Sequence, residues 1–114
     1  MALVLVDARN VLRSVWPNIP ERELVDRCRA WAAREGHEAV VVFDGSAPGG
    51  GQEGCEVVGT GRESADDWIA RRAAGPVQGE LWVVTSDREL RGRVAGARLL
   101  GGGAFARELL SLTL

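Results

Sequence analysis

The stretch Leu3-Val-Leu-Val-Asp7 decides the fold, because four apolar residues in a row stop at a carboxylate. The same pattern recurs at Ala39-Val-Val-Val-Phe43-Asp44, and a further apolar run occupies Leu81-Trp-Val-Val84. Short, unbroken apolar runs rich in branched residues are typical of strands buried on both faces, as in parallel sheets. We therefore predict that these three runs form the centre of a parallel sheet.

Helical periodicity separates the first two runs. Between residues 21 and 35 the apolar positions recur at helical spacing and share one face: Leu24, Val25, Cys28, Trp31 and Ala32. Gly36 follows as a natural helix stop. This segment is predicted to be a helix that packs its apolar face on the sheet.

Strand and helix patterns alternate along the rest of the chain. Further elements are predicted in this order: a strand at 56–58, a helix at 64–72, a helix at 88–94, a strand at 98–100 and a helix carrying Phe105, Leu109 and Leu110. Such alternation implies right-handed crossovers with helices on both faces of the sheet. We predict an α/β fold, a three-layer α/β/α sandwich with a mostly parallel central sheet, as a single domain over residues 1–114.

The composition excludes several classes of site. All 14 basic residues are arginines, which rules out a phosphate-binding P-loop lysine, a Schiff-base lysine and a response-regulator receiver. His37 is the sole histidine and the two cysteines lie far apart, so no structural zinc set can be assembled. The net charge of −2 offers no general attraction for polyanions, so a nucleic acid must be met by local arginines or bound metal.

Nothing in the sequence directs the chain to a membrane. The opening apolar run is too short for a signal sequence, and no apolar stretch approaches the ~18 residues that a membrane span needs. Two cysteines without a pairing pattern fit a reducing compartment. We expect a cytoplasmic protein without membrane contact.

Acidic residues follow the predicted strands at the points where they end. Asp7 and Asp44 come directly after apolar runs, and Asp87 closes the Thr85-Ser-Asp87 segment after a third. The helix predicted from Ser64 adds Glu63, Asp66 and Asp67. The carboxyl ends of parallel strands meet at one edge, so these acids are expected to converge there. Clustered carboxylates call for a hard dication, Mg²⁺ or Mn²⁺, and such ions support phosphodiester hydrolysis.

Each acid also has a structural interpretation. Ser64-Ala-Asp-Asp67 has the form of a capping box, and Ser86-Asp-Arg-Glu89 predicts Ser86 as a helix N-cap with Asp87 as a first-turn acid. Asp44-Gly45 is also typical of a simple turn. Sequence alone leaves these alternatives open.

Polar and aromatic residues near the predicted edge are candidates for binding. Asn10 either caps the turn after the first strand or holds the Asp7 carboxylate and a metal-bound water. Four arginines flank the edge: Arg9, Arg13, Arg62 and Arg88. Of these, Arg9 and Arg62 are the favoured phosphate contacts, the alternative being an ordinary solvated surface.

The four tryptophans divide into two groups. Trp31, Trp68 and Trp82 fall on apolar faces and are predicted to lie in the core. Trp16 lies in a loop flanked by proline and is a candidate for base stacking.

Other α/β sites do not match the first strand. A dinucleotide-binding fold needs a glycine-rich turn there, and Asp7-Ala-Arg-Asn10 stands in its place. A haloacid dehalogenase needs a second Asp two residues after the first, where this chain has Arg9, and an integrin-type metal site needs serines.

The sequence resembles the NYN-domain branch of the PIN-like nucleases, especially the YacP-like ribonucleases, over nearly the whole chain. The matching segments are Leu5-Val-Asp7-Ala-Arg-Asn10, Val41-Val-Phe43-Asp44-Gly45, Glu63-Ser-Ala-Asp66-Asp67-Trp-Ile69 and Val83-Val-Thr85-Ser-Asp87. Ala8-Arg9 departs from the Gly and Tyr that relatives often carry.

The resemblance implies a metal-dependent endoribonuclease. Asp7, Asp66 and Asp87 match carboxylates expected to bind Mg²⁺ or Mn²⁺, Asp67 matches a frequent second acid, and Asn10 matches the polar partner of the first Asp. Asp44 and Glu63 are additional acids, and RNA is expected to contact Arg9, Arg62 and Arg88.

Two other functions compatible with the resemblance remain open. One is an RNA-binding or ribosome-associated module that does not cut RNA, and the other is the toxin of a toxin–antitoxin pair. Leu112 and Leu114 permit a homodimer.

Overall fold

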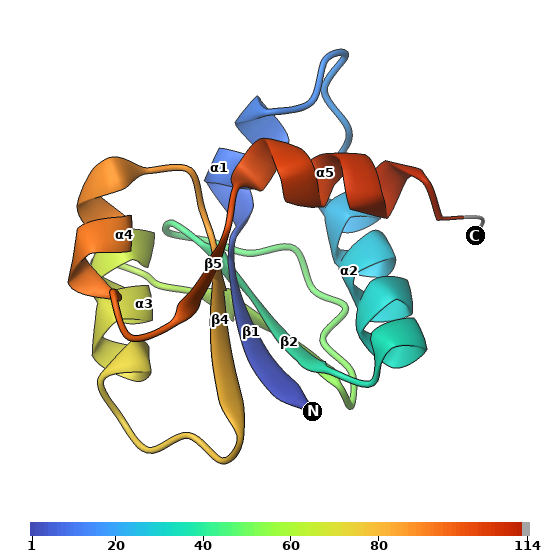
Figure 1. Cartoon of the computed structure of the whole chain (residues 1–114). Helices are drawn as coiled ribbons and strands as arrows, with labels where there is room; N and C mark the ends of the chain where they lie inside the picture. Colours follow the sequence, from blue (N-terminus) through green and yellow to red (C-terminus); the bar gives the residue numbers. More distant parts are fainter. Residues whose placement is uncertain (113–114) are drawn as a thin grey trace.

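The computed structural model of the protein describes residues 1–112, so Leu114 lies outside the described range. Over these residues the order of elements is β1 (Ala2–Asp7), α1 (Ala8–Arg13), α2 (Glu21–Glu35), β2 (Glu38–Phe43), β3 (Cys55–Gly59), α3 (Ala65–Ala73), β4 (Glu80–Val84), α4 (Arg88–Arg93), β5 (Arg98–Leu100) and α5 (Gly102–Leu110). The five described strands form one sheet in the order β3-β2-β1-β4-β5, and all four pairings are parallel (Figure 1). The prediction of a parallel α/β sandwich is confirmed.

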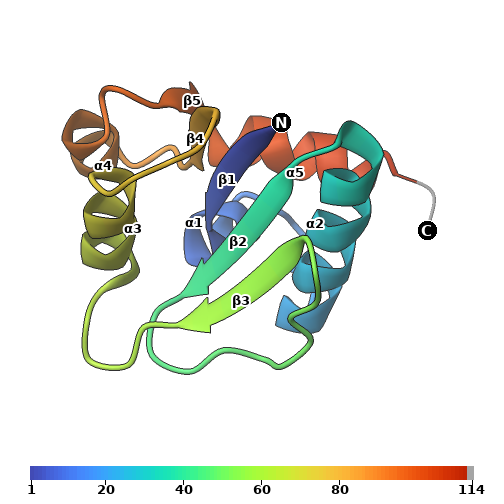
Figure 2. The ribbon, with the colours of Figure 1, turned by 90° about the horizontal axis from the view of Figure 1, so that it is seen from below.

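Helices cover both faces of the sheet. Figure 2 shows α3 and α4 on one side and α1, α2 and α5 on the other. Each side has its own apolar cluster, and β1 contributes alternate residues to both: Val4 and Val6 to one, Leu5 to the other. Because β1 is buried on both faces, an unbroken apolar run is what this position requires.

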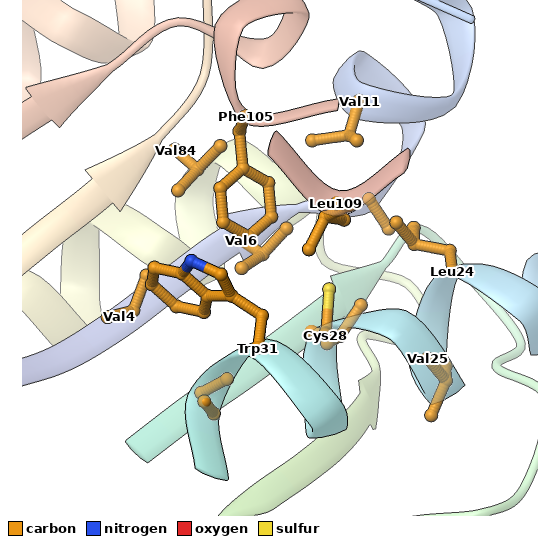
Figure 3. Close-up of a cluster of buried hydrophobic side chains, with 14 of the residues drawn as sticks. Val4, Val6, Val11, Leu24, Val25, Cys28, Trp31, Val84, Phe105 and Leu109 are labelled. Carbon is orange, nitrogen blue, oxygen red and sulfur yellow. The ribbon is translucent and has the colours of Figure 1, made fainter. Parts of the chain in front are cut away.

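The larger cluster packs α2 and α5 against the sheet (Figure 3). All five residues of the predicted α2 stripe are buried. Trp31 meets Phe105 of α5 edge-on at 5.0 Å between ring centroids, and its indole N–H donates to the Glu108 carboxylate at 3.0 Å. Gly36 ends α2 at φ 73°, the left-handed conformation that glycine adopts without strain.

Some predictions about individual elements were wrong. Helix α1 was not predicted, because its six residues are too few to show a helical period. Trp68 and Trp82 pack against the two apolar clusters as predicted but are only half-buried, and the Trp82 ring also lies 4.5 Å from the Arg98 guanidinium. On α5, Phe105 and Leu109 are buried, whereas Leu110 is 42% exposed.

Burial raises the pKa of both cysteine thiols, Cys28 and Cys55, so these thiols stay protonated and unreactive. Among the helices of residues 1–112, none combines the length and apolarity that crossing a membrane requires.

Candidate active site at the carboxyl edge of the sheet

Asp7 ends β1 and is the most buried acid of the site, with 6% of its surface exposed. The Thr85 hydroxyl, at the end of the neighbouring β4, donates to Asp7 Oδ2 at 3.0 Å. The same Thr85 oxygen accepts from the backbone N–H of Asp87 at 3.1 Å. Thr85 therefore fixes two of the predicted acids relative to each other, a role that the sequence did not reveal.

Four predicted acids line one cavity of about 200 Å³ at the carboxyl edge of the sheet. The cavity is lined by Asp7, Arg9, Asn10, Arg13, Asp44, Ser64, Asp66 and Asp87. Its walls come from the ends of β1 and β2, from one side of α1 and from the N-terminal ends of α3 and α4. Convergence at this edge was predicted from the positions of the acids after the strands, and the geometry agrees.

Two acids of the cavity, Asp7 and Asp66, have raised pKa values. Burial raises the pKa of Asp7, and the charges of Asp66 and Asp44 raise it further, against the hydrogen bond from Thr85. Partial burial likewise raises the pKa of Asp66, with added contributions from Asp87 and Asp44. The negative charge of this edge is thus incompletely compensated by the protein.

Asp44 is more than a turn residue. Its Oδ1 accepts from the backbone N–H of Ala65 at 2.9 Å, at the first residue of α3. Its Oδ2 lies 3.7 Å from Arg9 Nε. Asp44 therefore ties the end of β2 to the start of the helix that carries Asp66.

Asn10 positions the loop that carries Asp87. Its side-chain Oδ1 accepts from the Ser86 backbone N–H at 2.9 Å, and the Ser86 hydroxyl accepts from the Gly102 N–H at 2.8 Å. A Cβ on Gly102 would overlap the Asn10 amide, so the close approach of α5 to α1 requires glycine here. These bonds hold the first turns of α1 and α5 against the loop between β4 and α4.

Two helices at the cavity, α3 and α4, are capped by side chains. The Ser64 hydroxyl accepts from the Asp67 N–H at 3.0 Å, as the capping pattern predicted. The prediction of Ser86 as the cap of α4 was wrong by one residue: Asp87 is the N-cap, and its Oδ1 accepts from the Leu90 N–H at 3.0 Å. One Asp87 oxygen is therefore used structurally.

Several predicted site residues lie outside the cavity lining. Asp67 is paired with Arg93 at 2.8 Å, and Glu63 is paired with Arg71 at 2.8 Å. Arg62 and Arg88 are exposed and do not line the cavity, whereas Arg13 does. Arg9 and Arg13 are four residues apart on α1 and so share a helix face, which could not be expected before α1 was seen.

The donors of the cavity suit a hard cation, because they are carboxylate and amide oxygens. The described residues hold no group of three or more His, Cys, Asp or Glu side chains close enough to enclose an ion. Mg²⁺ commonly binds through one or two carboxylates and keeps several waters. Asp7 and Asp66 both line the cavity, and the charge of Asp66 acts on Asp7, so these two carboxylates are the candidates for such a site.

Comparison with known proteins identifies the family of this parallel α/β domain. Residues 4–112 match the YacP-like NYN domain family, whose members are ribonuclease-type domains. The chain belongs to this family. No significant match exists among curated proteins.

The fold of this YacP-like NYN domain is similar to that of Rae1 (YacP) from Bacillus subtilis. The crystal structure of a tryptophan-to-leucine mutant of Rae1 gives a TM-score of 0.77 at 23% identity, covering 97% of this chain and 76% of that chain. A second Rae1 crystal structure gives 0.75 at 23% identity, covering 97% and 75%. This likeness concerns the fold.

Proposed function

We propose that this YacP-like NYN domain is a metal-dependent endoribonuclease that hydrolyses phosphodiester bonds of RNA at the acidic cavity. The observation that carries the proposal is the convergence of Asp7, Asp44, Asp66 and Asp87 with two arginines on one cavity. Family membership supports RNA as the substrate class.

Asp7 and Asp66 would hold the ion, Mg²⁺ or Mn²⁺, directly, and the Asp87 oxygen that does not cap α4 would reach it through a water that the ion keeps. When bound, the ion supplies an activated water and offsets charge on the phosphate. Thr85 keeps the buried Asp7 carboxylate oriented. Asn10 acts through Ser86 by fixing the loop that carries Asp87.

Arg9 and Arg13 are the residues suited to hold the phosphates that flank the bond to be cut. Both line the cavity, and the Arg9 side chain is 57% exposed, so it can turn toward a phosphate. Arginine donates two parallel hydrogen bonds to a phosphate, which fixes the backbone without reading the base sequence.

The test is cleavage of a labelled single-stranded RNA with Mn²⁺ or Mg²⁺, comparing the native protein with Asp7→Asn. The matched control is Asp26→Asn, the same chemical change on α2, where Asp26 pairs with Arg29 at 3.0 Å. We expect cleavage that requires the ion, is lost in Asp7→Asn and is kept in Asp26→Asn.

Cleavage retained by Asp7→Asn would remove the proposed site. RNA that is bound but left intact by the native protein with either ion would favour the non-cutting RNA-binding function. That second function is the relevant alternative, because the described residues bring no three His, Cys, Asp or Glu side chains close enough together to hold an ion without water or RNA ligands.

A further inference from the structure

Trp16 is the one large aromatic side chain of the described chain that is almost fully exposed, at 88%. It lies in the segment between α1 and α2, which extends beyond the end of α1 on the side of the sheet where β1 ends (Figure 1). The other three tryptophans pair with neighbours: Trp31 with Phe105, Trp82 with Arg98 and Trp68 with Arg71. Trp16 forms no aromatic or cation–π pair with any residue among 1–112.

The segment that carries Trp16 is anchored on both sides. Val15 is 7% exposed, and Ile19 packs against the larger apolar cluster. The Ser14 hydroxyl donates to the Asn10 backbone oxygen at 2.9 Å. The Trp16 ring is thus presented to solvent by a fixed backbone, so little freedom is lost when a ligand covers it.

Trp16 is also close to the basic rim of the cavity. It follows Arg13 by three residues, so their Cα atoms are separated by at most about 11 Å. Arg13 and Arg9 line the cavity from one face of α1. An exposed aromatic ring beside arginines that face a cavity combines the two features used to bind single-stranded nucleic acid, base stacking and phosphate pairing.

We propose that Trp16 stacks on a base of single-stranded RNA whose neighbouring phosphates are held by Arg13 and Arg9. This inference rests on the proposed function and names the form of RNA taken by the same site. Because every base has a stacking face, the contact holds RNA of any sequence but requires an unpaired nucleotide.

The test measures binding without cleavage, in the Asp7→Asn protein, by fluorescence anisotropy of a short labelled oligouridylate. Trp16→Ala should raise Kd by between about fivefold and about a hundredfold, the range for loss of one stacked base. Trp16→Phe should retain most of the affinity. Leu110→Ala is the control, because it truncates another exposed apolar side chain, at the far end of α5.

A set of oligonucleotides lacking the base at one position each makes the test specific for stacking. At one position the loss of the base should weaken binding to the Asp7→Asn protein and have no further effect on Trp16→Ala. Equal affinity of Trp16→Ala and its parent would overturn the inference, as would the absence of such a position. Failure to cut RNA while Trp16-dependent binding persists would reject the nuclease and leave the inference standing.

Discussion

Asp66 and Asp67 are adjacent in the first turn of α3, but their surroundings differ. Asp66 lines the cavity, where its charge acts on Asp7. Asp67 does not line the cavity and forms an ion pair with Arg93 of α4. A sequence pattern places both at the start of α3, but successive helix residues point about 100° apart, so at most one faces a given cavity.

We therefore expect Asp66→Asn to reduce RNA cleavage strongly and Asp67→Asn to leave it nearly unchanged. Asp66→Asn should reduce cleavage by two or more orders of magnitude, in line with removal of a group that stabilises transition-state charge, roughly 10²–10³-fold. Asp67→Asn should keep most of the cleavage and lose at most ~1 kcal/mol of stability, because it weakens one exposed ion pair.

Initial rates of RNA cleavage, with unfolding measured in parallel, decide between the two acids. Strong loss of cleavage in Asp67→Asn with unchanged stability would contradict the assignment and move the ion toward the second acid of the pair.

The junction of α1 and α5 is a test of how the elements hold the site. Gly102→Ala would place a methyl group on the Asn10 amide, while Gly103→Ala meets its nearest atoms at 3.7 Å and 4.0 Å, an ordinary contact. We expect Gly102→Ala to cost about 1–3 kcal/mol, the range for overpacking. Gly103→Ala should be neutral or stabilising by about 0.5–1 kcal/mol, as alanine replaces glycine within a helix.

Urea unfolding and cleavage rates of both variants, each also in an Asn10→Ala background, check this prediction. Removing the Asn10 amide should reduce the cost of Gly102→Ala and leave Gly103→Ala unaffected. An equal cost of Gly102→Ala in both backgrounds would show that the strain arises elsewhere.

Patterns in the sequence identify the strands more reliably than they identify which residues line the site. The apolar runs that become β1, β2 and β4 are buried on two faces, so their composition alone identifies them. The acids after these strands converge because parallel strands end together. Glu63 was expected among the acids of the site but forms an ion pair with Arg71. Arg71 is eight residues away, so this pair depends on how α3 is packed and is not visible in the sequence.

Arg13 is a cavity residue whose place at the site could not be predicted from the sequence. Its place in the cavity depends on α1, and a six-residue helix carries too little periodicity to be recognised in a sequence. Once α1 exists, the spacing of Arg9 and Arg13 puts both on one face. The basic side of the site is therefore a consequence of a short element that is fixed by tertiary packing against α5 and the sheet.

At the scale of the whole molecule, the acidic edge lowers the free energy of unfolding at neutral pH. The pKa values of Asp7 and Asp66 are raised, first of all by burial, so the folded protein holds these protons to a higher pH than the unfolded chain does. The folded state then binds more protons than the unfolded state between the ordinary pKa of 3.8 and the raised one. The free energy of unfolding must fall as pH rises through that interval, and stay lower above it.

Asp7→Asn should remove the part of this loss that is due to Asp7, because the amide carries no charge and its oxygen can still accept from Thr85. At pH 7 the variant should be more stable than the native protein, by about 1.4 kcal/mol for each unit by which the pKa is raised, and the difference should shrink toward about pH 4. The control is Asp26→Asn, the same chemical change on α2 and outside the cavity lining, which should not bring this gain in stability at pH 7.

Urea unfolding across this pH range, repeated with Mn²⁺, completes the argument. An ion that binds the folded state stabilises it by mass action, so Mn²⁺ should raise the stability of the native protein at pH 7 and have little effect on Asp7→Asn. A native protein more stable than Asp7→Asn at pH 7 without the ion would mean that the edge compensates its own charge, and the reason for expecting a cation there would be lost.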